Sequence, residues 1–258
     1  MTEPGLYQPV IDLPKGIKAF VTTRNGGFSE GPWQSFNLGE HVKDDPAAVA
    51  ANRALLKQQL VVATGSSSLD LQWLNQVHGT TVHHAHGPST SSPPQADALY
   101  TNRTNLVCGV LTADCLPVLF SSTDGQEIAV AHAGWRGLQK GVLEKTIACF
   151  NAPPAQIIAW MGPAIGPCHF EVGDEVREAF LESAQEMTAV TENAFLPSVN
   201  RGKWFADLYQ LARIRLLSAG LTKIGGEPTC TVCENARWYS YRHSPLTGRF
   251  ATLIVKTT

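Results

Sequence analysis

Apolar and polar positions in the middle of this chain form blocks rather than a simple alternation. The stretch from Gly109 to Gly137, GVLTADCLPVLFSSTDGQEIAVAHAGWRG, contains apolar runs that turn residues separate. Runs of this length with such boundaries predict strands that are buried on both faces of a sheet. Polar side chains at the ends of such strands need a structural or chemical reason, and here they are Asp114, Cys115 and His132.

The remaining blocks predict an α/β chain. Further strands are predicted from Ile17 to Thr23 and in the segments TTVHHAH, ADALYT and QIIAWMG. A helix is predicted from Pro46 to about Leu60, after a capping Asp44 or Asp45. Three more helices are predicted in GLQKGVLEKTIACF, in residues 173–187 and in FADLYQLARIRLLSAG, and the C-terminal segment WYSYRHSPLTGRFATLIVKTT predicts a hairpin-like tail. GPSTSSPPQ is interpreted as a surface loop, and without a linker or repeat we expect one domain over residues 1–258.

Composition narrows the classes of function. The chain has 258 residues, 43% of them hydrophobic, and a net charge of −2 with no basic block. This disfavours a nucleic-acid polymer as partner, although a mononucleoside or a phosphate remains compatible. The N-terminal residues lack a cationic start and a long apolar core, and no apolar run approaches the roughly 18 residues of a membrane span. We therefore expect a cytoplasmic protein without a membrane partner.

Six cysteines are expected to be reduced thiols, because nothing in the sequence indicates secretion. Cys230 and Cys233 form a CxxC pair. A structural zinc site takes four ligands, so a single CxxC pair is a weak indication of one. Cys168 and His169 are adjacent, so their side chains are expected to point in different directions, and we interpret both as structural.

Cys115 and His132 are the strongest candidates for chemistry. A thiol and an imidazole at strand ends can bind a soft or borderline metal, or can act as a nucleophile and its base. His78, in LQWLNQVHG, is a third candidate ligand. The three are far apart in sequence, so only the fold can bring them together. A free cysteine in an apolar run is also common core packing, so the residues alone leave these interpretations open.

Two arginines are candidates for binding an anion. Arg24 ends a predicted strand before the loop RNGGFSEGPW, and a planar guanidinium binds two phosphate oxygens at once. A surface arginine at this position also commonly pairs with a carboxylate. Arg136 lies where a helix is predicted to begin after HAGWRG, and its N-terminal N–H groups would face an anion. Asp97 either caps a turn or has a role at the site, as a support for other residues or as a contact to substrate.

The chain contains, in this order, the sequence motifs TTRNGGFSEGPWQSFNLGEHV, NQVHG, TADCLPVLF, HAGWRG, MGPAIGPCHFEVGDEV and WYSYRHSPLTGRF. From about Phe20 onwards the chain resembles the YfiH-like family, also called the DUF152, laccase-domain or polyphenol-oxidase family. The resemblance implies an α/β, single-domain layered sandwich of mixed β-sheets flanked by helices, of the CNF1/YfiH-like type. It also implies a zinc site whose ligands are His78, Cys115 and His132, with copper as an alternative metal.

The resemblance implies a purine nucleoside phosphorylase that converts adenosine, inosine, guanosine or methylthioadenosine and phosphate to base and ribose 1-phosphate, with adenosine deaminase activity. Three protein ligands leave one position of a zinc ion open, and zinc lowers the pKa of bound water to about 7. This suits deamination, with Asp114 moving protons and with Cys115 and His132 in the catalytic centre. Phosphorolysis needs phosphate placed against C1′ of the ribose, for which Arg24, Asn75 and Arg136 are the candidates.

Three alternatives stay open. A metal-free cysteine hydrolase or deamidase would use Cys115 as nucleophile and His132 as base, as in toxin deamidases that the fold resembles. A copper-dependent polyphenol oxidase would need an axial ligand, and neither Met161 nor Met187 shows a sign of that role. A peptidoglycan-precursor editing factor is proposed for some relatives. The sequence does not determine the preferred nucleoside or the oligomeric state.

Overall fold

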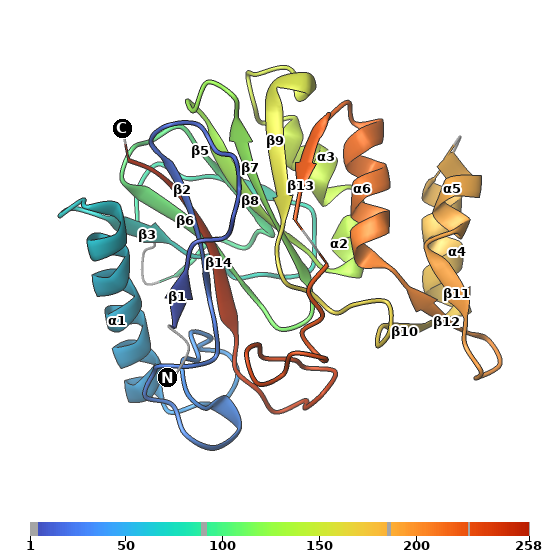
Figure 1. Ribbon diagram of the computed structural model, residues 1–258, viewed down its shortest axis with the longest axis horizontal. Coiled ribbons are helices and arrows are strands. Elements are labelled where there is room, and N and C mark those ends of the chain that lie inside the picture. The colour runs from blue at the N-terminus through green and yellow to red at the C-terminus, as the bar shows by residue number, and fades with distance from the viewer. Residues whose placement is uncertain (1–4, 89–91, 185–186, 227, 258) are drawn as a thin grey trace.

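Two β-sheets pack face to face at the centre of the molecule, and helices cover their outer faces (Figure 1). The computed structural model describes residues 5–88, 92–184, 187–226 and 228–257. The first sheet has the order β1-β2-β14-β6-β3. Its strands are β1 (Leu6–Tyr7), β2 (Ile17–Thr22), β3 (Asp70–Gln72), β6 (Leu106–Thr112) and β14 (Phe250–Lys256).

The second sheet has the order β13-β9-β7-β8-β5-β4. Its strands are β4 (Val82–His84), β5 (Ala98–Thr101), β7 (Leu116–Ser122), β8 (Ile128–Ala133), β9 (Ile157–Met161) and β13 (Lys223–Gly225). A small third sheet consists of β10 (Glu171–Gly173), β12 (Lys203–Ala206) and β11 (Phe195–Pro197). The helices are α1 (Pro46–Thr64), α2 (Trp135–Gln139), α3 (Val142–Ile147), α4 (Asp174–Ser183), α5 (Thr188–Glu192) and α6 (Leu208–Ser218), with short 3₁₀ turns η1 (Gly31–Trp33) and η2 (Pro154–Gln156).

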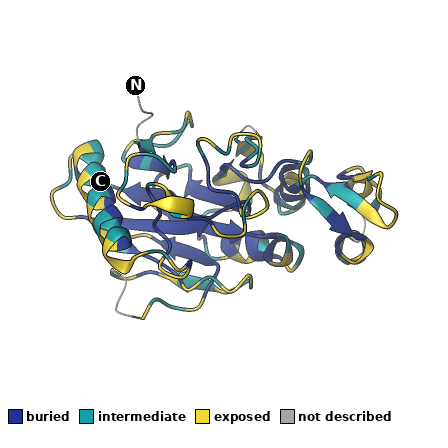
Figure 2. Ribbon diagram, turned by 90° about the horizontal axis from the view of Figure 1, so that it is seen from below, coloured by how far each residue is buried: buried dark blue, intermediate teal, exposed yellow. Residues whose placement is uncertain are grey.

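Both faces of the central strands are buried, which explains their continuous apolar runs. Successive side chains of a strand point to opposite faces. In β14, Leu253 and Val255 pack towards α1, whereas Ile254 packs between the two sheets. In β7, Leu119 lies between the sheets, and Phe120 packs towards α2 and α3. Figure 2 shows these strands as the buried centre of the molecule. The predicted α/β layers of mixed sheets flanked by helices are confirmed.

Helix α1 begins where the sequence predicts and continues four residues beyond the predicted end. The side chain of Asp45 accepts a hydrogen bond from the Ala47 N–H, and Pro46 occupies the first helical position. The helix ends at Gly65, whose φ of 75° is the left-handed conformation of a C-cap. Its buried face packs on the first sheet and fixes one outer layer.

Two predictions about local structure are wrong. GLQKGVLEKTIACF is not one helix but parts of α2 and α3, because Gly141 between them adopts a φ of 92°. The C-terminal segment is not a hairpin-like tail, since β14 pairs antiparallel with both β2 and β6 in the middle of the first sheet. All seven residues of β14 are buried, because a strand in the middle of this sheet is covered on both faces. The predicted helix over 173–187 ends at Ser183, and residues 185–186 lie outside the described part.

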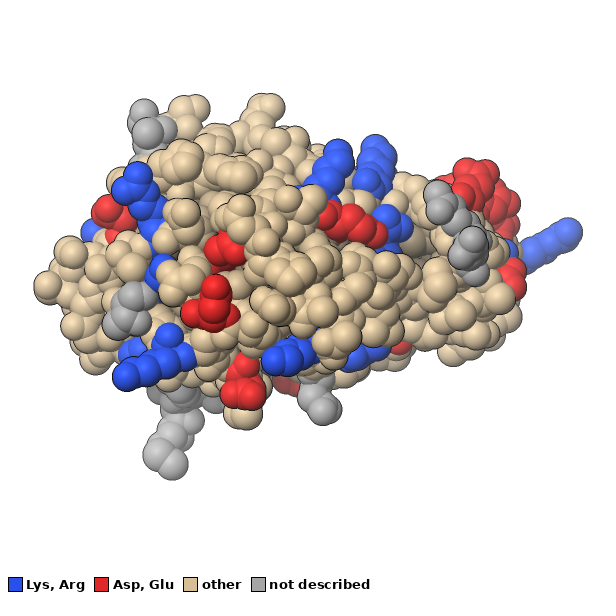
Figure 3. Space-filling view, turned by 90° about the horizontal axis from the view of Figure 1, so that it is seen from above, with Lys and Arg blue, Asp and Glu red and all other residues tan. Residues whose placement is uncertain are grey.

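The segment from β10 to β12, with α4 and α5, projects from one end of the two-sheet core (Figures 1 and 2). Lysine, arginine, aspartate and glutamate side chains are interspersed on the face that Figure 3 shows, without an extended area of one sign. No helix in the described ranges has the length and apolar character needed to cross a membrane. Residues 89–91 of the predicted surface loop GPSTSSPPQ lie outside the described residues.

Candidate metal centre

The chain passes from the first sheet to the second at two places that carry candidate ligands. His78 lies between β3 and β4, and Cys115 lies between β6 and β7. At the first crossing His78 has a φ of 59°, and at the second Asp114 has a φ of 95°. Residues other than glycine rarely adopt this conformation, and they keep it only where surrounding contacts hold it. The two crossings bring the imidazole of His78 and the thiol of Cys115 together.

His132 reaches the same place from the end of β8. In the pairing of β7 with β8, Pro117 is opposite His132, so Cys115 lies close to the end of β8. The Sγ of Cys115 is 3.8 Å from Nε2 of His78. The rings of His78 and His132 stand edge to face, with centroids 4.7 Å apart. One donor atom from each of the three residues lies within 4.8 Å of the others. His78 is exposed, Cys115 half-buried and His132 buried.

Asp97 orients both histidines. Asp97 directly precedes β5, which pairs with β8. The backbone carbonyl of Asp97 accepts a hydrogen bond from the backbone N–H of His132 at 2.7 Å. Its fully buried carboxylate accepts a hydrogen bond from Nδ1 of His132 at 2.8 Å. The same carboxylate accepts the backbone N–H groups of His78 at 2.9 Å and Gly79 at 2.6 Å. Because Nδ1 of His132 is engaged, its Nε2 is the nitrogen left for the cluster.

Electrostatic coupling among these groups favours their charged forms. Burial alone raises the pKa of the Asp97 carboxyl, but the hydrogen bonds from His132 and the backbone hold it below its ordinary value. Burial likewise raises the pKa of the Cys115 thiol, yet His132 and His78 lower it to about 6. Burial lowers the pKa of His132, whereas Cys115 and Asp97 raise it to about 9. Without a bound ion, the coupling therefore favours a thiolate at Cys115 beside an imidazolium at His132.

Comparison with known proteins shows the family to which the chain belongs. The family model described as multi-copper polyphenol oxidoreductase laccase matches residues 18–257. The chain belongs to this laccase-like family. It is 48% identical over 250 residues to the purine nucleoside phosphorylase YfiH of Escherichia coli, covering 96% of this chain and 98% of the relative. It is 47% identical over 241 residues to a purine nucleoside phosphorylase of Pseudomonas aeruginosa, covering 93% and 94%.

A solved structure of the same family extends the likeness to three dimensions. The crystal structure of a DUF152 protein from Neisseria meningitidis matches with a TM-score of 0.90 and 41% sequence identity, over 99% of this chain and 100% of that chain. The resemblance to the YfiH-like family that the sequence motifs indicated is thus confirmed, and so is the layered sandwich that it implied.

The three side chains fit a zinc ion, the metal that the resemblance to this family implies. One thiolate and two imidazoles are ligands that zinc takes, and a set of three leaves a fourth position open. Gly134 packs directly against them, since a Cβ there would lie 3.0 Å from Sγ of Cys115 and 3.0 Å from Cδ2 of His78. The hydrogen bond from Nδ1 of His132 to Asp97 is the support that ligating histidines in metal sites commonly have.

Asp114 is turned towards the C-terminal part of the chain. Its carboxylate accepts the Thr231 hydroxyl at 2.6 Å and the Arg242 backbone N–H at 2.6 Å. Its carbonyl accepts the Ile165 N–H at 2.8 Å. These contacts hold the left-handed turn that precedes Cys115. The predicted role of Asp114 in moving protons stays a prediction, and the contacts give it a positioning role.

The three predicted contacts to substrate or phosphate lie in different surroundings. Arg24 donates to the carbonyls of Gln34 at 3.1 Å and Asn235 at 2.8 Å, so its guanidinium joins two loops. Asn75 is exposed and its backbone pairs with Gln95. Arg136 is exposed in the first turn of α2, two residues after the glycine that contacts the cluster, and its guanidinium lies 4.3 Å above the Trp135 ring. All three stay predictions as phosphate contacts.

A second group of side chains could also hold a metal, and sequence reasoning missed it. Cys168, His169, Cys230 and Cys233 each offer an atom, and these atoms lie within 4.8 Å of one another. The interpretation of Cys168 and His169 as merely structural did not connect them with the distant CxxC pair. The signal available in the sequence was the coincidence of one Cys-His pair with one CxxC pair, which together supply four ligands.

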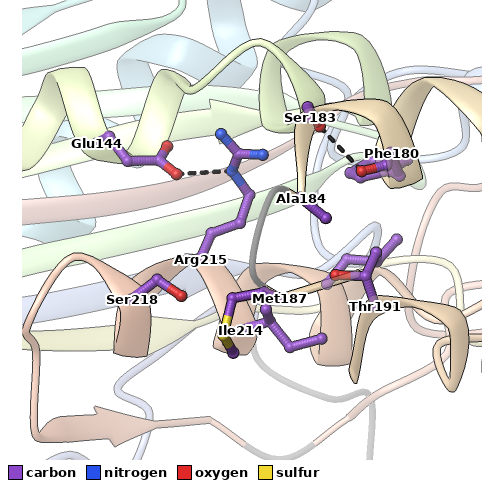
Figure 4. A pocket seen from close by; sticks show the side chains of 10 residues that line it. Glu144, Phe180, Ser183, Ala184, Met187, Thr191, Ile214, Arg215 and Ser218 are labelled. Carbon is purple, nitrogen blue, oxygen red and sulfur yellow. Dashed lines mark hydrogen bonds and ion pairs between the residues drawn. The ribbon is translucent and has the colours of Figure 1, made fainter. Parts of the chain in front are cut away.

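A cavity of about 500 Å³ lies away from both groups, among α3, α4, α5 and α6 (Figure 4). Glu144 and Arg215 form an ion pair of 2.7 Å at its wall. None of its lining residues belongs to either candidate metal group. We therefore place the candidate chemistry at the sheet crossings and not in this cavity.

Replacing Asp97 with asparagine should weaken metal binding. The substitution keeps the shape but removes the charge that supports His132 and the backbone of His78, and loss of such a support typically costs about 10- to 100-fold in metal affinity. Competition with a chromogenic chelator measures the change. Asp124→Asn, in a turn where the carboxylate accepts the Gln126 N–H, is the matched control and should bind metal as the wild type does. Equal affinity in the two variants would contradict the role of Asp97.

In protein stripped of metal, Cys115 should react with iodoacetamide at mildly acidic pH. Its lowered pKa means that the thiolate is present above about pH 6 and is lost as the pH falls through that value. Peptide mass spectrometry across a pH series measures the rate at each cysteine. Cys149, whose pKa burial raises, is the internal comparison and should react only at higher pH. A midpoint for Cys115 at the ordinary thiol value of about 8.5 would contradict the coupling to His132.

Proposed function

We propose that this protein is a zinc-dependent purine nucleoside phosphorylase. In this proposal it converts adenosine, inosine, guanosine or methylthioadenosine and phosphate to base and ribose 1-phosphate, and it also deaminates adenosine. The observation that carries the proposal is the convergence of His78, Cys115 and His132 at an accessible point between the two sheets. Relatives that align along nearly the whole chain and are named purine nucleoside phosphorylase support the substrate class.

The residues around the cluster have distinct tasks in this proposal. His78, Cys115 and His132 would hold the ion, and a zinc ion there supplies a Lewis acid that stabilises negative charge developing beside it. Asp97 keeps His132 in the tautomer whose Nε2 faces the cluster. The exposure of His78 leaves the site open to a small molecule. The proposal includes a cytoplasmic location, where a nucleoside enzyme would act.

Phosphate needs a positive partner close to the reacting sugar, because holding both reactants in place lowers the entropic barrier. Arg136 is favoured among the three candidates, since it follows closely on Gly134, which packs against the cluster. Arg136 is exposed, and its guanidinium packs over the ring of Trp135, which helps to hold the cation in place. Arg24 and Asn75 are the further phosphate or substrate contacts in the proposal, with Arg24 also holding two loops together.

A metal-free cysteine hydrolase is the second candidate, and one observation favours it. Cys115, His132 and Asp97 are arranged as a nucleophile, its base and the carboxylate that orients the base. Such an arrangement activates a thiol. His78 has no necessary part in that chemistry. The two candidates therefore differ in what they require of His78. No contact among the described residues adds support to copper-dependent phenol oxidation or to editing of a peptidoglycan precursor.

The test combines metal analysis with a nucleoside assay on protein purified without added metal. Wild type should contain zinc and release hypoxanthine from inosine only when phosphate is present. His78→Ala should lose about one equivalent of zinc and at least about 100-fold in activity, since even supporting residues of metal sites cost 10- to 100-fold. His86→Ala, an exposed histidine outside the cluster, is the control and should match the wild type.

Other outcomes of the same test contradict the proposal in different ways. Hydrolysis that needs neither metal nor phosphate, survives His78→Ala and is lost in Cys115→Ser would favour the cysteine hydrolase. Copper with oxidation of phenols would favour the oxidase. Hypoxanthine release without phosphate would exclude phosphorolysis, and failure to form inosine from adenosine would remove the deaminase activity alone.

A further inference from the structure

Four potential metal ligands meet on the surface between two segments that are distant in sequence. Cys168 and His169 lie in the turn between β9 and β10, and Cys230 and Cys233 follow β13. The Sγ of Cys168 is 3.6 Å from that of Cys233 and 3.9 Å from that of Cys230. Nδ1 of His169 is 3.1, 3.6 and 3.5 Å from the sulfurs of Cys168, Cys230 and Cys233. None of the four belongs to the cluster around Cys115.

These separations are those of a tetrahedral site. Ligands at the corners of a tetrahedron with zinc–sulfur bonds of about 2.3 Å lie about 3.8 Å apart, and a nitrogen at about 2.0 Å lies slightly closer to each sulfur. The two sulfur–sulfur distances, 3.6 and 3.9 Å, lie on either side of that value. The Nδ1 of His169 lies slightly closer to the sulfurs of Cys230 and Cys233, at 3.6 and 3.5 Å, and closer still to that of Cys168, at 3.1 Å. Three thiols and one imidazole also match a ligand set of structural zinc sites.

Adjacent residues supply two of the ligands because a tight turn redirects one of them. The N–H groups of His169 and Phe170 both donate to the carbonyl of Gly166, so the chain folds back at this point. His169 faces the sulfurs with Nδ1, the ring nitrogen nearer its backbone. The expectation that neighbouring side chains point apart is wrong here, since it assumes an extended chain rather than a turn.

Gly166 fits the cluster in two ways. Its N–H donates to the sulfur of Cys230 at 3.3 Å, a support that metal-bound thiolates commonly have. A Cβ at this position would lie 2.9 Å from Cβ and 3.2 Å from Sγ of Cys230. Only glycine allows the backbone to approach so closely.

We propose that Cys168, His169, Cys230 and Cys233 bind a zinc ion in a structural site. Four protein ligands close the coordination sphere, so the ion would have no open position for substrate. Its role is to join the turn after β9 to the segment after β13. This is a second site, and its ligands take no part in the proposed nucleoside chemistry.

The joined segments both contact the residue before Cys115. Ile165 donates its N–H to the carbonyl of Asp114, and the Thr231 hydroxyl donates to the Asp114 carboxylate at 2.6 Å. Ala164 and Cys230 form a β-bridge between the same two segments. A zinc ion at the second site therefore stabilises the turn that presents Cys115 to the first.

Metal counting in single variants tests the proposal. Cys233→Ser and Cys168→Ser should each hold about one zinc equivalent less than wild type, because each substitution removes one thiolate of a closed four-ligand site. Cys115→Ser should lose the other equivalent and keep this one. Cys149→Ser, a cysteine outside both groups, should keep the wild-type content. Both ligand variants should also unfold at lower temperature than Cys149→Ser.

A second measurement covers variants that fail to fold. Cys115→Ser protein, stripped and reloaded with cobalt(II), should show the thiolate-to-cobalt absorption of a site with several sulfur ligands, and zinc should displace it. The proposal is overturned if Cys115→Ser protein takes up no cobalt or zinc. It is also overturned if Cys233→Ser retains the full wild-type zinc content, or if native protein carries a Cys230–Cys233 disulfide, seen as a two-hydrogen mass loss under non-reducing conditions.

Discussion

The buried carboxylate of Asp97 is the interaction on which the candidate centre depends. Complete burial of a carboxylate costs folding free energy unless hydrogen bonds replace its hydration, and Asp97 has no exposed surface. Here the imidazole of His132 and the backbone N–H groups of His78 and Gly79 do so. One side chain thus ties the crossing that carries His78 to the end of β8. The same charge fixes which nitrogen of His132 faces Cys115, so geometry and electrostatics at the cluster have a common origin.

The fold places chemistry where the chain changes sheets. Strands buried on both faces form the centre, and most of their buried polar side chains lie at or near the strand ends. The two crossings lie at these ends, and each includes a residue with positive φ, His78 or Asp114. The contacts of Asp114 with Ile165 and Thr231 extend this support to the turn that carries the second group of cysteines. Both proposed ions would therefore act on one connected set of loops.

The sequence predicts those parts of the fold that local pattern encodes. The central strands follow from their apolar runs, and the start of α1 follows from Asp45 and Pro46. The central position of β14 could not be read from its own residues, since it pairs with β2 near the N-terminus and with β6 in the middle of the chain. The same limit applies to the second cysteine group, because nothing near Cys168 indicates that it meets Cys230. Ligand types can be read from sequence, whereas their meeting in space depends on long-range register.

Anomalous X-ray diffraction at the zinc edge, from crystals of protein purified without added metal, tests the central claim most directly. The account predicts a peak in contact with Sγ of Cys115, Nε2 of His132 and the imidazole of His78, with Nδ1 of His132 still bonded to Asp97. A map with no anomalous density among these three side chains, or with His132 turned so that Nδ1 has left Asp97, would contradict it.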